Sequence, residues 1–192
     1  MNVERSVIEL PPGYRCREAG MFMAQLDELS QRMHNDLRDI APSELEWQPM
    51  PGMNTIGMLL THLAIVEVFW TQIGVMGVPE DSQSVLGIGL YDDGLPFPEG
   101  GLAPAHLAGK SLSYFADLFD RARAYMKRAA VGLSDADLET MRTRTRHTGA
   151  QEELNVRWVI YHVLEHFAGH YGQILLLRHQ FRDTRRPSTT PA

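Results

Sequence analysis

The sequence predicts an all-α protein, and two patterns in its 192 residues lead to this prediction. First, several long segments carry apolar residues at the spacing of three and four that is typical of amphipathic helices. Second, the alternation of apolar and polar residues that marks half-buried strands is nearly absent. We therefore expect a four-helix bundle. The expected helices span residues 17–39, 54–76, 111–130 and 154–181, with at most a short hairpin or strand around 139–149.

Prolines mark both ends of the first expected helix. Pro11, Pro12 and Gly13 mark a turn before the first helix, and Pro42 ends it. Its apolar face consists of Phe22, Leu26, Leu29, Met33 and Leu37. The second helix has Asn54 as its expected N-cap. Its wide apolar face consists of Ile56, Leu59, Leu60, Leu63, Val66, Phe69, Trp70 and Ile73. His62 lies among these residues, so its imidazole is directed at least partly inward.

Residues 77–109 form a long connection that is rich in glycine and proline. Connections of this length are typical either of a functional lid or of a disordered insertion. The third helix follows, with an apolar face of Leu112, Phe115, Leu118, Phe119, Ala122, Tyr125, Met126 and Ala129. In the fourth helix, Gly169 and Gly172 would each cost about 1 kcal/mol relative to alanine if they were exposed. We therefore expect a neighbouring helix to approach closely beside His170.

The composition is that of one ordinary globular domain, which we place at residues 17–181. Residues 1–16 are an N-terminal extension, and 182–192 are expected to form a flexible tail. The formal net charge of −6 argues against a nucleic-acid-binding groove. The apolar stretches are interrupted too early for a membrane span and no signal peptide is evident, so we expect a cytoplasmic protein. The single cysteine, Cys16, excludes an internal disulfide and leaves metal binding to histidines and carboxylates.

The fourth helix carries three histidines at steps of four residues, His162, His166 and His170. Four residues are little more than one helical turn, so the three imidazoles project from nearly one stripe. Two imidazoles one turn apart can bind the same divalent cation at about 2.0–2.1 Å. Alternatively, these are neutral core histidines with hydrogen-bond partners. We favour a metal, because each buried histidine would otherwise need its own partner.

Two segments carry a resemblance to a known family. They are NTIGMLLTHLAIVEVFW, preceded by SELEWQPMPGM, and YHVLEHFAGHYGQILLLR. Both resemble the DinB-like superfamily, also called YfiT-like metal-dependent enzymes, whose members have a Leu-x-x-His pattern on the second helix and His-x-x-x-His-x-Gly-Gln on the fourth. The resemblance implies a DinB/YfiT-type bundle with metal ligands at His62, His166 and His170. His162 is expected to brace a ligand or to line the pocket. Relatives often have arginine where this chain has Tyr171.

A site of three neutral histidines leaves the cation its full charge and at least one open position. Zinc, nickel, copper and iron all suit such a site, and we expect zinc or nickel in the purified protein. The cation could activate water or hold a thiol as thiolate. The resemblance favours the thiol, because several relatives are transferases or isomerases that use low-molecular-weight thiols such as bacillithiol or mycothiol. We therefore expect a metal-dependent thiol S-transferase that acts on a small-molecule substrate, with the catalytic residues still unknown.

Two other functions remain open. In a metal-dependent hydrolase, Glu165 or Glu67 would orient the attacking water, although neither carboxylate is well placed by its spacing. The third alternative is a non-catalytic, dimeric metal-binding or stress-response module, because apolar side chains on more than one face of the second helix would also serve a homodimer interface. An enzyme requires a pocket beside the metal. Its expected rims are the connection of residues 77–109 and Arg144, which lies in a basic stretch that ends at His147.

Overall fold

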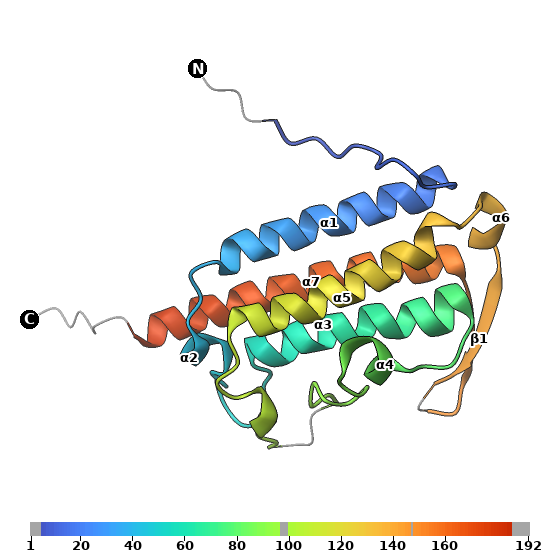
Figure 1. Ribbon diagram of the computed structural model, residues 1–192. Helices are drawn as coiled ribbons and strands as arrows, with labels where there is room; N and C mark the ends of the chain where they lie inside the picture. The colour runs from blue at the N-terminus through green and yellow to red at the C-terminus, as the bar shows by residue number, and fades with distance from the viewer. Residues whose placement is uncertain (1–4, 97–99, 147, 186–192) are drawn as a thin grey trace, which may run out of the picture.

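The computed structural model describes residues 5–96, 100–146 and 148–185, and this part of the chain is mostly helical, as predicted (Figure 1). Four long helices lie side by side in it (Figure 1). They are α1 (Arg17–Leu37), α3 (Ile56–Trp70), α5 (Leu112–Val131) and α7 (Val156–Thr184). Both α5 and α7 pack against α3, and α1 packs against α5 and α7. Short helices α2 (Pro42–Leu45) and α6 (Asp135–Leu138) lie in the connections.

Helix α3 is the central helix of the core. Twelve of its fifteen residues are buried, so its apolar side chains are covered on nearly every face. It begins after Thr55, whose hydroxyl accepts a hydrogen bond from the backbone N–H of Met58 (3.1 Å), and not after Asn54 as predicted. It continues into a π-helix, η1 (Thr71–Met76). Within the described residues, Ile56–Met76 is the one helix with the length and composition of a membrane span, and 78% of an apolar 18-residue stretch in it is buried inside the protein, as in a core helix.

The predicted hairpin is present, but it extends further than expected. Strand β1 (Met141–Thr145) pairs antiparallel with β2 (Gln151–Asn155), with Thr143 opposite Glu153. Because β2 occupies residues 151–155, α7 begins at Val156 and not at 154. At its other end α7 runs to Thr184, so residues 182–184 belong to the helix and not to a tail. The rest of the predicted tail, from 186 onward, lies outside the described residues.

The connection between η1 and α5 folds onto the body of the protein. It contains α4 (Ser82–Leu86) and a 3₁₀ turn, η2 (Ala105–Leu107). Leu86 is buried in a second apolar cluster, together with residues of α3 and α5. The Gln72 side chain also bonds the backbone of Asp81 in both directions, at 2.7 and 3.1 Å. The described part of this connection is therefore an ordered element, and the alternative of a disordered insertion is wrong there.

The glycines of α7 do not mark a close helix contact. Gly169 and Gly172 are exposed, and a Cβ atom on either would have no neighbour within 4 Å. The prediction of close packing beside His170 is therefore wrong for the described chain. Close approaches occur instead at Gly57 and Gly74. A Cβ on Gly57 would lie 2.9 Å from the Phe115 ring, and one on Gly74 would lie 2.7 Å from Val159.

Candidate metal centre

Helices α3 and α7 bring three histidines together. His62 lies on α3, whereas His166 and His170 lie one turn apart on α7. The Nε2 atom of His166 is 3.2 Å from Nε2 of His62 and 3.1 Å from Nε2 of His170. One ring nitrogen from each histidine falls within 4.8 Å of the others. Among the residues that the structure describes, no other histidine, cysteine or carboxylate joins this group. We call these three residues the histidine triad.

The triad is electrostatically suited to a cation. Burial, together with the nearby His170, His62 and His162, lowers the pKa of His166 to about 3. Burial also lowers the pKa of His170, although its hydrogen bond to Gln173 opposes this shift. Both imidazoles are therefore neutral at pH 7, so each keeps a nitrogen lone pair. Neutral imidazole nitrogens that converge from two helices form a donor set that fits a divalent metal ion.

Two further side chains contact the Nδ1 atoms of His62 and His170. Nδ1 of His62 lies 2.8 Å from Oδ2 of Asp93, and Nδ1 of His170 lies 2.9 Å from Oε1 of Gln173. A ring that donates its Nδ1–H to an oxygen presents the Nε2 lone pair to the metal. Gln173 is the glutamine of the His-x-Gly-Gln pattern. Asp93 was not predicted, and its only signal was an acidic pair, Asp92–Asp93, in a glycine-containing turn.

His162 lies beside the triad but outside it. Its ring stacks on Trp158 with centroids 4.7 Å apart, and the Trp70 ring meets it edge-on at 5.2 Å. The centroids of His162 and His166 are 5.7 Å apart. The two tryptophans therefore fix the position of His162 next to the candidate ligands. This place suits a pocket-lining residue, and that role stays a prediction.

Arg144 reaches the same aromatic cluster from strand β1. Its guanidinium carbon lies 4.4 Å from the centre of the Trp70 ring, and its Nε donates to Glu152 at 2.6 Å. Arg146 also pairs with Glu152, and these hydrogen bonds lower the pKa of Glu152 to about 2. The Trp70 ring therefore lies in contact with both Arg144 and His162. His147 lies outside the described residues.

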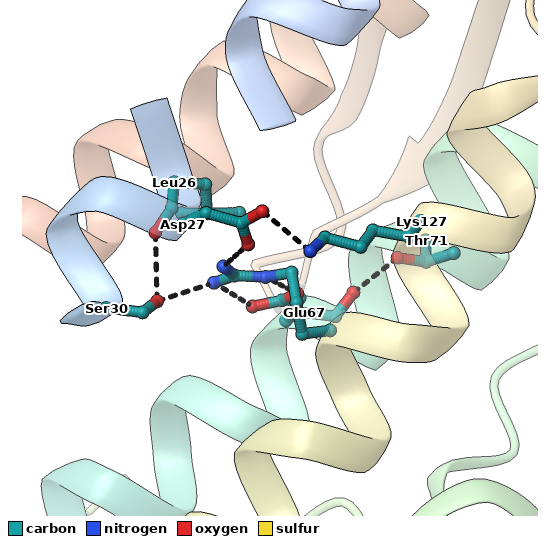
Figure 2. Close-up of polar contacts among 7 residues, drawn as sticks. Leu26, Asp27, Ser30, Glu67, Thr71 and Lys127 are labelled. Atoms are coloured by element: carbon teal, nitrogen blue, oxygen red, sulfur yellow. Dashed lines mark hydrogen bonds and ion pairs between the residues drawn. The ribbon is translucent and has the colours of Figure 1, made fainter. Parts of the chain in front are cut away.

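The two carboxylates considered for a hydrolase are not at the triad. Glu165 is exposed, and its Oε2 lies 3.5 Å from Nδ1 of His162. Glu67 is buried and accepts two hydrogen bonds from Arg123, at 2.6 and 3.1 Å (Figure 2). Arg123 also bonds Asp27 and Ser30 on α1, so this ion-pair network ties together α1, α3 and α5 (Figure 2). The structure therefore gives Glu67 a structural role in place of the predicted pocket role.

A cavity of about 570 Å³ lies between α1 and α5 and not at the triad. Its lining includes Leu60 and Phe115, together with the charged side chains of Asp27, Arg123 and Lys127. Asp27 already pairs with both Arg123 and Lys127 (Figure 2). None of the three histidines lines this cavity, so it is not the space beside the candidate metal centre.

Comparisons with known proteins identify the family. The sequence matches the DinB superfamily over residues 25–174, a range that contains all three histidines of the triad. A comparison with curated proteins finds no match. The matched range covers most of the chain, and the resemblance seen in its sequence motifs points to the same family. The chain therefore belongs to the DinB superfamily.

Proposed function

We propose that this protein is a metal-dependent enzyme in which His62, His166 and His170 bind one divalent cation, zinc or nickel. The proposed reaction joins a low-molecular-weight thiol to a small electrophilic substrate. The observation that carries the proposal is the convergence of three imidazole nitrogens within 4.8 Å, with no fourth protein donor among the described residues. A structural site normally has four protein ligands, whereas a catalytic site keeps a position open.

The chemistry of the proposed reaction follows from this donor set. A cation held by the three neutral imidazoles would keep its charge and lower the pKa of a thiol, so that the thiol would release its proton to solvent and be available as thiolate. In the proposed reaction the sulfur would form a bond to the electrophilic carbon, and the leaving group would depart with the electron pair of the bond that breaks. The protein orients His62 through Asp93 and His170 through Gln173. Ring orientation of this kind typically changes metal affinity by about 10–100-fold.

Partial exposure of the neighbouring side chains supports a site that substrate can reach. The side chains of His62 and His162 are 20% and 26% exposed, and that of Arg144 is 31% exposed. Arg144 and Arg146 share the single carboxylate of Glu152, so these three side chains together carry one net positive charge. We propose that the rim selects substrates or thiols that carry an anionic group.

A hydrolase is the second candidate, and the placement of the carboxylates weighs against it. Glu67 is committed to Arg123, and Glu165 is 58% exposed. Neither is in position to orient a water molecule at the triad. A non-catalytic metal-binding module is the third candidate. It would be favoured by a fully closed coordination shell, for which the described residues offer no further ligand.

The remaining expectations about organisation are also proposals. We propose that residues 17–181 form a single DinB/YfiT-type four-helix bundle, with 1–16 as an extension, and that the protein is cytoplasmic. A homodimer is proposed as well, but α3 no longer supports it because the core of the same chain covers its apolar faces. The apolar side chains that favour a dimer are instead the exposed Leu175 and Leu176 on α7. Gel filtration with light scattering tests the dimer.

Metal analysis followed by turnover assays tests the proposed function. The purified protein should contain close to one equivalent of zinc or nickel, and His166→Ala should contain none. The metal-loaded protein should then consume electrophile in the presence of a thiol from a panel that includes bacillithiol and mycothiol, and His166→Ala should be inactive. Turnover of ester or amide substrates without a thiol would favour the hydrolase. A metal-loaded protein with no turnover in either assay would favour the binding module.

A further inference from the structure

The connection between η1 and α5 contributes one buried charged side chain to the candidate metal centre. Asp93 is only 2% exposed. Its Oδ2 lies 2.8 Å from Nδ1 of His62, and its Oδ1 accepts a hydrogen bond from the backbone N–H of Leu95 at 2.9 Å. In the described ranges of the chain, no arginine or lysine forms an ion pair with Asp93. Its nearest charge-bearing partner is therefore an imidazole of the triad.

This arrangement leaves the negative charge of Asp93 without a permanent cation. Buried charges in proteins are normally paired or lie beside a metal ion. The partner that the structure shows is the His62 ring, whose Nδ1 faces this carboxylate. A divalent cation on the opposite nitrogen, Nε2 of His62, would supply a positive charge through the ring. The contact therefore points to a cation independently of the clustering of the three histidines.

The turn that carries Asp93 is held firmly against α3. The N–H of Gly89 donates to the Asp92 carboxylate at 2.8 Å, and the N–H of Gly94 donates to the carbonyl of Tyr91 at 3.0 Å. Gly94 has a φ of +80°, and a Cβ atom there would lie 2.5 Å from Pro104. The same Cβ would lie 3.4 Å from the Met58 side chain, which is one helical turn before His62. The backbone of the turn therefore fixes where the Asp93 carboxylate can lie.

We propose that Asp93 is a positioning residue for the metal centre and that it couples metal binding to the folding of the turn formed by residues 89–95. This inference rests on the proposed metal site. His62 binds metal best when Asp93 holds its ring, and Asp93 holds the ring only when the turn is folded. By linkage, the turn raises metal affinity, and bound metal stabilises the turn by the same free energy.

The experiment compares Asp93→Asn with Asp92→Asn in the full-length protein, with Zn²⁺ as the probe. Asparagine at 93 keeps the size of the side chain and one accepting oxygen but removes the charge. Asp92 is the matched control, because its carboxylate bonds Gly89 in the same turn and belongs to no contact with the triad. Zinc affinity is measured by competition with a chromogenic chelator. We expect Asp93→Asn to weaken zinc binding by about 10–100-fold, the usual effect of losing such a partner, and Asp92→Asn to change it by less than about threefold.

Hydrogen exchange of the backbone amides provides the second measurement. Zinc should slow exchange at Gly94 and Leu95 in the wild-type protein and in Asp92→Asn, but not in Asp93→Asn. If Asp93→Asn does not fold, as judged by circular dichroism, Asp93→Ser replaces it, because a serine hydroxyl can still accept the Leu95 N–H.

The outcomes separate this inference from the proposed function. If the wild-type protein does not bind zinc at all, the proposed metal site fails, and the inference fails with it. If the wild-type protein binds zinc and Asp93→Asn binds it with equal affinity, Asp93 is not a positioning residue although the metal site stands. An equal loss of zinc affinity in both variants would also overturn the inference. Unfolding of the turn, and not the loss of the Asp93 contact, would then explain the weaker binding.

Discussion

Replacing Glu67 with glutamine tests whether the buried network in Figure 2 is structural. Glu67 is 1% exposed and accepts two hydrogen bonds from Arg123, which in turn is 9% exposed. The change keeps the shape of the side chain but leaves the guanidinium with one charged partner, Asp27, which also pairs with Lys127. Removal of one partner from a buried ion pair costs about 3–5 kcal/mol. Because Asp27 retains its contact, we expect a loss near the lower limit, about 3 kcal/mol.

The assay is urea and thermal unfolding followed by circular dichroism. For a chain of this size, about 2–4 °C are lost per kcal/mol, so the Tm of Glu67→Gln should fall by about 6–12 °C. The control is Asp117→Asn, which breaks an exposed pair with Arg121 and should cost less than about 1 kcal/mol. The double variant Glu67→Met/Arg123→Met should lose less stability than Glu67→Gln, because no charge is left unpaired. Zinc binding should be unchanged. A Glu67→Gln variant that keeps wild-type stability, or that loses its metal, would refute this reasoning.

Three further predictions concern α7 and its neighbours. Gly169→Ala should stabilise the protein by up to about 1 kcal/mol in urea unfolding, because the site is an exposed helix interior with open space around the new Cβ. By contrast, Gly57→Ala should destabilise it by about 1–3 kcal/mol, since the Cβ would lie 2.9 Å from Phe115; equal effects at the two positions would contradict the packing described above. In metal-free protein, the pKa of His166 is lowered from 6.5 to about 3, so the unfolded chain binds a proton that the folded chain does not. Stability should therefore fall as the pH drops from about 6.5 toward 3, and His166→Ala should lose less than wild type between pH 7 and pH 5 in urea midpoints. Zinc affinity should weaken over the same pH range because the ligands must be deprotonated, and a flat calorimetric profile would argue against histidine ligands.

The long helices could be predicted because each places apolar residues on a helical period. The period recurs in α1, α3, α5 and α7. Their ends were less predictable, because a cap depends on the local backbone. Thr55 caps α3 although the neighbouring Asn54 is of a type that is preferred over threonine at N-caps. In the same way, β2 occupies residues that a helical pattern alone assigned to the start of α7.

The candidate site was predictable where it lies on helices. His166 and His170 are one turn apart, and His62 occurs in an apolar helix, so sequence spacing indicated that each could face the core. Asp93 could not be found in this way, because the path of a non-periodic connection depends on what it packs against. The next residue, Gly94, lies so close to Pro104 and to Met58 of α3 that an added Cβ would be 2.5 and 3.4 Å from them, and the sequence pattern does not show this packing. The pairing of Glu67 with Arg123 likewise depends on the register between α3 and α5.

The unequal burial of α3 and α7 has a consequence for how this protein can diverge. His62 lies on α3, which is buried on almost every side. Most substitutions around it would therefore disturb the core. His166 and His170 lie on a helix with exposed positions such as Gly169 and Gly172, where an added Cβ would meet no atom of the described residues within 4 Å. Sequence drift should therefore be slow along α3 and faster at these two positions of α7. New substrate preferences would then arise by mutation of the hairpin and of the first turns of α7, while the histidines themselves stay in place.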